Sequence, residues 1–223
     1  MLNGSIDTNK LKTKAWDGNS TKEFIESQGF SYPQGILGPT YGWQFRYSGA
    51  LFPSKEGGVD QLSSLIHTIQ TDPHSRRLLI NLWNPSDVPK MVLPPCGFCY
   101  QFYVNETGHL DCKLTQRSSD IVLAGGWNIA SCALFVSLLS HTLGLSPGRI
   151  IWSVGDVHVY HNQIQAAQTQ INRPPTALPS LEILRPRPKD GEDLVQYLTT
   201  FQYSDIVVHN YTPHPALRVP FSA

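Results

Sequence analysis

The sequence predicts an α+β or α/β domain with a sizeable, partly antiparallel sheet. Segments with helical periodicity alternate with short segments that are rich in β-branched and aromatic residues. This intermixed order is typical of domains in which helices pack on a sheet. Of the 223 residues, 40% are hydrophobic and 10% aromatic, so the chain is able to bury a substantial core. We therefore expect one domain that spans residues 1–223.

The first third of the chain contains two predicted helices and one strand. Ser20 and Glu23 have the spacing of a capping box, which predicts a short helix that ends at Gly29. A second helix is predicted within residues 58–73, and residues 76–83 have the composition of a buried strand. The apolar face of the second helix consists of Leu62, Leu65, Ile66 and Ile69.

The middle of the chain indicates a hairpin followed by a core helix. Residues 100–104 and 111–118 are predicted strands, and the segment NETGHL between them contains the turn. Residues 128–145 are apolar nearly all round, which favours a helix buried in the core and closed near Gly144.

The last third alternates again between extended and helical patterns. Residues 149–160 predict a strand, and residues 161–171 predict a helix. Two late strands are expected at residues 181–186 and 204–210. The sheet is thus built from segments distributed over the whole chain.

Composition and charge exclude several classes of function. The 17 Lys and Arg residues balance 17 Asp and Glu residues, so no general attraction to DNA or to acidic membranes is expected. The first ten residues lack the pattern of a signal peptide, and the most apolar stretch, ACALFVSLL, is too short to span a bilayer. Four cysteines without an export signal fit a reducing compartment. We expect a cytoplasmic protein.

The segment LPPCGFCYQF has two cysteines in C-x-x-C spacing, which occurs in redox pairs and in zinc sites. The following residues look extended, and positions three apart in a strand point to opposite faces, so a Cys96–Cys99 disulfide is disfavoured. Cys112 and Cys132 are isolated and form no compact ligand set with the histidines, so no metal is expected. One cysteine acting alone remains as the sharper hypothesis, and four cysteines that merely fill the core as the plainer one.

A lone catalytic thiol needs an activating partner or an electropositive setting. Arg76, Arg77 and Arg117 are the candidates, because the planar guanidinium also suits bidentate contact with phosphate. His158 and Tyr160 lie two apart on a predicted strand, so they share one face and both can reach a ligand hydroxyl. On spacing alone, a histidine satisfied in the core is the favoured interpretation of His158. The residues alone indicate a cysteine nucleophile acting on a phosphorylated small molecule.

Several blocks, in this order and at these distances, resemble the thymidylate synthase family. They are LGPTYGWQFR, DPHSRRLLINLWNPSD, LPPCGFCYQFYV, QRSSD, NIASCALF, GDVHVYHNQI and YTPHPALRVPFSA. The resemblance covers essentially the whole chain. It implies an α+β layered fold with a large mixed sheet packed by helices, in which one sheet face forms a homodimer interface.

The resemblance also implies a reaction. The family methylates deoxyuridine monophosphate at carbon five, with methylenetetrahydrofolate as one-carbon donor and reductant. A thiolate adds at carbon six and makes carbon five nucleophilic, which is covalent catalysis. Cys96 aligns with that nucleophile, and the charge of Arg117 favours its thiolate form. Tyr41 matches a tyrosine implicated in removing the carbon-five proton.

The remaining site residues are implied in the same way. Asn128 matches the side chain that reads the uracil edge, because its amide both donates and accepts hydrogen bonds. Arg76 and Arg77 match a pair that crosses the dimer interface to the partner's nucleotide phosphate. The other nucleotide-contacting matches are Gln116, Ser118, Ser119, Asp120, His158 and Tyr160. The folate-contacting matches are Trp16, Asp120, Leu123, Ala124, Trp127 and the C-terminal Ala223.

The sequence departs from the family at several points. Gly97 replaces a histidine, Ala124 a glycine and Trp127 a phenylalanine, and the last two changes add bulk beside the folate. We also expect the family's N-terminal segment, which bears a phosphate-binding arginine and a glutamate, to lie outside this sequence. These departures leave two alternatives open, namely a pyrimidine nucleotide hydroxymethylase and a truncated, non-catalytic nucleotide-binding remnant. A thiol redox protein is a more distant third.

Overall fold

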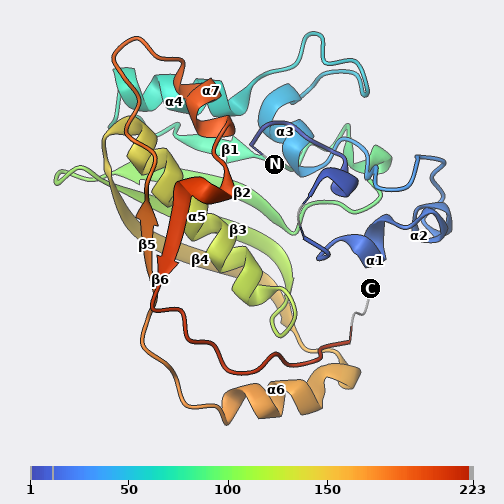
Figure 1. Ribbon diagram of the computed structural model, residues 1–223. Helices are drawn as coiled ribbons and strands as arrows, with labels where there is room; N and C mark the ends of the chain where they lie inside the picture. Colours follow the sequence, from blue (N-terminus) through green and yellow to red (C-terminus); the bar gives the residue numbers. More distant parts are fainter. Residues whose placement is uncertain (1, 12, 221–223) are drawn as a thin grey trace.

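The computed structural model describes residues 2–11 and 13–220. Figure 1 shows how its strands and helices are arranged. The strands are β1 (Leu79–Asn81), β2 (Gly97–Val104), β3 (His109–Asp120), β4 (Ser146–His158), β5 (Ser180–Ile183) and β6 (Ile206–His209). The helices are α1 (Asp17–Ser20), α2 (Lys22–Ser27), α3 (Tyr41–Tyr47), α4 (Gln61–Thr71), α5 (Gly125–Leu143), α6 (Ile164–Ile171) and α7 (Leu194–Thr199). Short 3-10 turns cover Thr8–Lys10, Val88–Lys90, His161–Gln163 and Tyr203–Asp205.

The main sheet is mixed, as predicted, with strand order β1-β2-β3-β4. The first three strands pair antiparallel, whereas β3 and β4 pair parallel. A parallel pair needs a crossover connection, and α5 supplies it. The parallel pairing brings the ends of β3 and β4 to the same sheet edge, with Asp120 opposite His158. This edge is where most of the predicted site residues lie.

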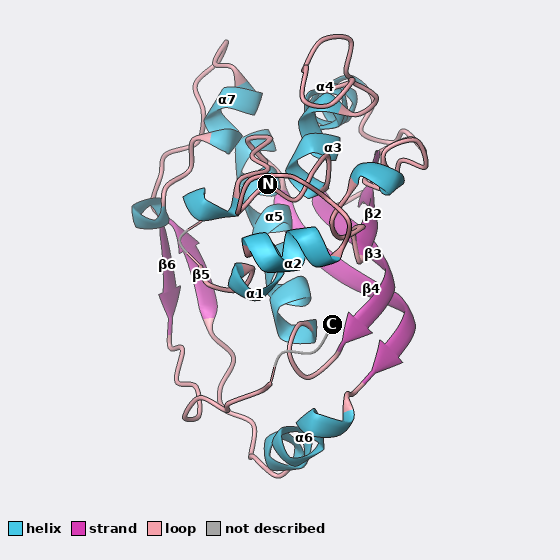
Figure 2. Ribbon diagram, turned by 90° about the vertical axis from the view of Figure 1, so that its right-hand side faces the viewer, coloured by secondary structure: helices cyan, strands magenta, loops and turns pink. Residues whose placement is uncertain are grey.

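Three layers surround the core. Helix α5 packs along β3 and β4, and the antiparallel pair β5–β6 lies on the far side of α5 (Figure 2). Helices α3, α4 and α7 pack at one end, and α6 lies apart at the other (Figure 1). The central hydrophobic cluster includes Ile80 from β1, Phe102 from β2, Leu114 from β3 and Leu139 from α5. An α+β layered fold is thus confirmed.

Helix α5 fits the prediction of a core helix. It is the one helix within the described residues that is long and apolar enough to cross a membrane by those two criteria alone. Its contacts with the sheet account for this apolarity, because Phe135, Leu138 and Leu139 are buried there. Gly144 ends the helix in the left-handed conformation, with φ of 73°, as the Gly144 prediction required.

Several element predictions need correction in detail. The first predicted helix is α2, and it is capped by Thr21, whose side chain accepts the Phe24 N–H, so the capping box at Ser20 is wrong by one residue. The strand predicted at residues 76–83 is regular only over β1, and it is buried on one face only, because Leu78, Ile80 and Leu82 face the core while Leu79 and Asn81 are exposed. Helices α1, α3 and α7 are not predicted from the sequence.

One face of the main sheet has no covering layer within the described residues. Alternate side chains of each strand face α5, and the others face outward. Leu79 of β1, Tyr103 of β2 and Ile151 of β4 are large apolar residues on the outward positions, and all three are exposed. Figure 2 shows this side of the sheet away from α5 and from β5–β6. An uncovered apolar sheet face of this kind is typical of an interaction surface.

An ion pair between the buried carboxylate of Asp111 and the exposed guanidinium of Arg149 joins β3 to the start of β4. Asp111 is 5% exposed. Its carboxylate accepts the backbone N–H of Arg149 at 2.7 Å, and accepts from the Arg149 Nε and Nη2 atoms at 3.2 and 2.8 Å. The side-chain hydrogen bond with Arg149 lowers the pKa of Asp111, and burial opposes this only in part.

We expect the Asp111→Asn variant to unfold at a temperature about 2–4 °C lower than the parent chain at pH 7. A carboxylate with a lowered folded-state pKa stabilises the fold above its unfolded-state pKa of about 3.9, and this contribution is lost as the pH falls through the lower folded-state value. The difference between the two proteins should therefore disappear in strong acid. Thermal denaturation followed by circular dichroism between pH 2.5 and 7 measures it.

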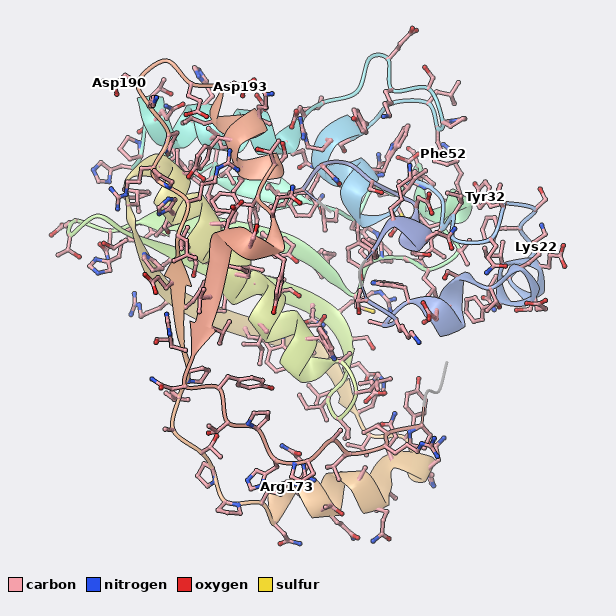
Figure 3. All side chains as sticks on the ribbon, in the orientation of Figure 1. Lys22, Tyr32, Phe52, Arg173, Asp190 and Asp193 are labelled. Atoms are coloured by element: carbon pink, nitrogen blue, oxygen red, sulfur yellow. The ribbon has the colours of Figure 1, made fainter. Side chains whose placement is uncertain are left out.

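The matched control is Asp190→Asn. Asp190 is exposed on the connection before α7 and has no side-chain partner within the described residues (Figure 3). That variant should unfold like the parent chain at every pH. A constant difference between Asp111→Asn and the parent chain across the whole pH range would contradict the proposed contribution of the carboxylate charge.

Candidate active site

Cys96 immediately precedes β2, as predicted, and is partly buried. Pro94 and Pro95 restrict the backbone before it, which fixes the direction in which the strand begins. The Tyr41 hydroxyl, from the first turn of α3, accepts the Cys96 backbone N–H at 2.9 Å. The thiol is thus held on a short extended segment between a helix terminus and the sheet.

Arg117 of β3 is the basic residue that the fold brings to this thiol. Its Nη2 atom lies 3.8 Å from the Cys96 sulfur. Nε and Nη2 also donate to the carbonyl groups of Pro95 and Pro94, each at 3.1 Å, and the Arg117 backbone N–H donates to the Cys96 carbonyl at 2.9 Å. The Trp83 ring lies under the guanidinium, with 5.9 Å from Cζ to the ring centroid. Arg117 is therefore fixed in position and places a positive charge beside the sulfur.

Tyr41 is held as a neutral phenol. Burial raises its pKa far above the ordinary value, and the neighbouring Cys96 raises it further. The edge of the Tyr41 ring contacts Trp16, with ring centroids 5.6 Å apart. Two residues predicted from separate parts of the sequence, one for proton transfer and one for folate, are thus neighbours. Because the phenol stays neutral, it is suited to orient or relay a proton through its hydroxyl, and unsuited to act as a phenolate base.

The parallel ends of β3 and β4 form a polar edge. Ser118 pairs with Asp156 and Asp120 pairs with His158 in the strand register. The His158 Nδ1 atom lies 3.0 Å from a carboxylate oxygen of Asp156, and the rings of His158 and Tyr160 are 5.1 Å apart. His158 is only partly buried, so the fold presents it at a surface edge, as a ligand-contacting role requires.

The turn from β3 into α5 carries a second group of predicted residues. Asp120 accepts the Leu123 N–H at 3.0 Å, and the Asp120 carbonyl accepts the Ala124 N–H at 2.8 Å. Asn128 lies in the first turn of α5 and is partly buried. Trp127 is 63% exposed, so its indole stands free at the surface and can cover a planar ring.

Gln163 is a site residue that sequence reasoning missed. It is fully buried, and its amide nitrogen donates to Asp120 Oδ2 at 2.7 Å and to the Pro220 carbonyl at 3.0 Å. It therefore ties the C-terminal segment to the turn that holds the predicted folate residues. The C-terminal segment runs back toward this region in Figure 1. The residue sits inside the block GDVHVYHNQI, but a glutamine on a helical pattern gives no signal of such a contact.

Gln116 and Ser119 differ from the other predicted nucleotide contacts because both are buried. The Gln116 amide oxygen accepts the indole N–H of Trp152, and its nitrogen donates to the Ser118 carbonyl at 3.3 Å. Gly97 lies opposite Gln116 in the strand register, and a Cβ atom at Gly97 would meet Gln116 Cγ at 3.4 Å. The position of the family's histidine is therefore close-packed here. The Ser119 hydroxyl has no partner within the described residues.

Two further predictions fall outside this arrangement. Arg76 and Arg77 are exposed before β1, and within the described part of the chain neither forms an ion pair or a side-chain hydrogen bond. The fold of one chain does not bring them to Cys96. Ala223 lies outside the described residues.

The other three cysteines are free thiols away from the site chemistry. Cys99 lies on β2, and burial raises the pKa of its thiol, which makes it a poorer nucleophile at neutral pH. Cys112 and Cys132 are fully buried, with their sulfur atoms 3.8 Å apart. No group of three His, Cys, Asp or Glu side chains among residues 2–11 and 13–220 is placed to hold a metal.

This geometry can support nucleophilic attack by sulfur on a substrate whose anionic group is held by arginine. Comparison with known families gives a consistent result. The family model described as thymidylate synthase matches residues 1–223. Relatives include a bifunctional dihydrofolate reductase-thymidylate synthase from Leishmania major, 42% identical over 98% of this chain and 42% of that protein.

Thymidylate synthase from Homo sapiens is 40% identical over 98% of this chain and 70% of that protein. Thymidylate synthase 1/2 from Encephalitozoon cuniculi is 40% identical over 100% of this chain and 76% of that protein. The chain thus spans less than half of the bifunctional relative and about three quarters of the others. With a family match over its full length, the chain belongs to the thymidylate synthase family.

Proposed function

We propose that this protein methylates deoxyuridine monophosphate to thymidine monophosphate, with methylenetetrahydrofolate as the one-carbon donor and reductant. The observation that carries the proposal is the contact between Cys96 and Arg117, 3.8 Å apart, in a chain that matches the family throughout. A nucleophilic sulfur fixed beside a guanidinium is the minimum that the reaction requires, because the sulfur becomes negatively charged before it attacks.

The nucleotide is proposed to lie along the polar edge of β3 and β4. Arg117 contacts its phosphate, Asn128 reads the uracil edge, and His158 and Tyr160 hold the deoxyribose hydroxyl. Cys96 adds to carbon six of the pyrimidine, so that the electron pair of the carbon five–carbon six double bond moves toward the ring carbonyl and carbon five becomes nucleophilic. The 2.9 Å hydrogen bond between Tyr41 and the Cys96 backbone supports this placement, because it puts a neutral hydroxyl beside the thiol.

The reduced folate is proposed to lie between the N-terminal region and the turn before α5. Trp16 and Trp127 offer aromatic faces, and the partly buried Asp120 carboxylate can accept hydrogen bonds from an amino-substituted ring. Gln163 holds that carboxylate at 2.7 Å, which fixes its orientation. Ala124 and Trp127 are bulkier than the family's usual residues, so a tilted or more weakly bound folate is expected.

We further propose a homodimer that buries the outward face of the main sheet. On β3 every second side chain faces outward, and these side chains include Lys113 and Arg117. Arg117 is exposed and contacts Cys96. The uncovered face therefore reaches the candidate site. A partner chain seated there would bring its exposed Arg76 and Arg77 near a nucleotide phosphate that one chain alone holds incompletely.

The function is tested by incubating the protein with deoxyuridine monophosphate and methylenetetrahydrofolate. Formation of dihydrofolate, seen as an absorbance rise, together with thymidine monophosphate supports the proposal. Formation of tetrahydrofolate with a hydroxymethylated nucleotide would instead establish the hydroxymethylase. Nucleotide binding without either product would indicate a non-catalytic relative.

The dimer is tested by mixing two inactive variants, Cys96→Ser and the double variant Arg76→Ala/Arg77→Ala. In a mixed dimer, one of the two sites combines an intact Cys96 with intact arginines from the other chain. Random exchange should therefore restore about one quarter of the parent activity, measured as thymidine monophosphate formation.

Activity no greater than the sum of the two separate variants would contradict a shared site. A monomer at high concentration in gel filtration would contradict the dimer itself. As a control, Cys96→Ser alone at the same total protein concentration should stay inactive.

A further inference from the structure

A cavity lies at the C-terminal end of α5, away from the candidate active site. It has a volume of about 240 Å³ and is bounded by the last turn of α5, the start of β4 and strand β5 with the residues that follow it. Because α5 rises about 1.5 Å per residue, the cavity lies about 20 Å from Asn128, which is in the first turn of the same helix. The cavity is therefore separate from the candidate active site.

Two nitrogen-bearing side chains line the cavity. The Arg187 guanidinium lies close to the C-terminal end of α5, where a Cβ atom on Gly144 would be 3.6 Å from its Nη1 atom. A cation is favoured at that helix end, so the side chain is held there. Arg187 has no ion pair and no side-chain hydrogen bond among the described residues. Its N–H donors remain available to a ligand.

His141, from the last turn of α5, provides the second polar group. Its Nε2 atom is buried and has no hydrogen-bond partner of normal geometry within the described chain, although the carbonyl groups of Arg185 and Pro186 lie near the ring. Burial lowers the pKa of His141, and the charges of Arg187 and Arg185 lower it further, so the imidazole is neutral at pH 7. The cavity wall thus carries one full positive charge, that of Arg187.

Four of the remaining wall residues are apolar, and Ser137 adds a hydroxyl that donates to the Ala133 carbonyl at 2.9 Å. Leu145, Pro147, Leu181 and Ile183 contribute hydrocarbon surface on two sides. A site with one cation and an apolar wall is complementary to a molecule with one negative charge and a hydrocarbon body. Inorganic phosphate matches it poorly, because a small dianion would leave the apolar wall uncovered and exceed the single positive charge.

We propose that this cavity binds a small organic monocarboxylate, whose carboxylate pairs with Arg187 and whose hydrocarbon body packs against Leu181 and Ile183. A carboxylate matches the planar guanidinium in a two-point contact. His141 contributes the surface of its ring to the wall and no charge, because its Nε2 atom is buried. The site is independent of the proposed methyl transfer, since none of its residues belongs to the candidate active site.

The test is isothermal titration of the full chain with sodium hexanoate. A dissociation constant on the order of 1 mM is expected for a ligand of this size. The Arg187→Gln variant should weaken hexanoate binding about tenfold or more. Arg187 is exposed, so this variant should fold normally, which unchanged circular dichroism verifies. Lys189→Gln removes the same charge from a nearby exposed residue that does not line the cavity, and it should bind hexanoate within about twofold of the parent chain.

Three results would overturn the proposal. The first is equal binding of hexanoate by the parent chain and by Arg187→Gln. The second is equal or tighter binding of hexanamide or inorganic phosphate, because then the charge or the apolar body would not matter. The third is competition between hexanoate and deoxyuridine monophosphate, which would place hexanoate in the other site. Since the readout is binding, the outcome does not depend on catalytic activity.

Discussion

Replacing Cys96 with serine is expected to lower thymidine monophosphate formation on the order of 10⁴-fold or more. The hydroxyl that replaces the thiol is far less acidic, so the ring carbon is no longer attacked and carbon five stays unreactive. Arg117 keeps its hydrogen bonds to the carbonyl groups of Pro94 and Pro95, so the phosphate site should survive. The expected result is therefore retained nucleotide binding without turnover, measured by calorimetry and by the dihydrofolate absorbance assay.

The control variant is Cys99→Ser, which changes the thiol three residues further along the chain, within β2. Cys99 is partly buried, does not contact Arg117 and should be dispensable for turnover. A deoxyuridine monophosphate with fluorine in place of the carbon-five hydrogen has no proton there to lose, so it should stay attached to Cys96 as an adduct when the folate is present. Mass spectrometry of the digested protein locates the adduct. An adduct on Cys99, or full activity of Cys96→Ser, would refute the assignment of the nucleophile.

The elements that the sequence predicts best are those whose own residues decide their structure. Helix α4 has its predicted apolar face, and Leu62, Leu65, Ile66 and Ile69 are all buried. Helix α5 ends at Gly144 because a left-handed conformation favours glycine there. In contrast, the sequence of α3 has no strong periodicity of apolar residues, and this helix depends on the packing of Trp43 and Phe45 in the core. Such tertiary contacts are invisible in local patterns.

The contacts of the candidate site also differ in whether the sequence alone can predict them. His158 and Tyr160 could be placed together from the sequence because they are two residues apart on a predicted strand, and their ring centroids are 5.1 Å apart. The Cys96–Arg117 contact depends on strand register between β2 and β3, and the Tyr41 contact depends on α3 packing across the sheet. Only the family resemblance links such residues before a structure is known. Gln163 shows the limit, because its two contacts join segments 43 and 57 residues away.

The two hydrogen bonds of Gln163 link the C-terminal segment to the candidate active site. It holds Asp120 from one side and the chain at Pro220 from the other, so the turn that carries the predicted folate residues and the C-terminal segment are positioned together. Closure of such a segment over bound ligands excludes water from the reacting atoms. The proposed carboxylate cavity lies at the opposite end of α5 and shares none of these contacts.

Asn128→Asp is expected to reverse the preference for the pyrimidine base. The uracil edge presents a carbonyl oxygen and a ring N–H, which one amide side chain can satisfy by donating to the first and accepting from the second. An ionised carboxylate only accepts, so it faces the uracil oxygen with a like partial charge. We expect kcat/KM for deoxyuridine monophosphate to fall on the order of 10²–10⁴-fold, since a buried polar contact is left unpaired.

A cytosine edge has the opposite pattern, with an acceptor nitrogen and an amino donor. A protonated aspartate can donate to that nitrogen and accept from the amino group, so deoxycytidine monophosphate should bind Asn128→Asp more tightly than the parent chain does. Calorimetry with both nucleotides measures the change. Asn172→Asp introduces the same group at the exposed end of α6 and should change neither affinity. If Asn128→Asp still prefers the uracil nucleotide, Asn128 does not read the base, and the nucleotide must be oriented by the edge of β3 and β4 alone.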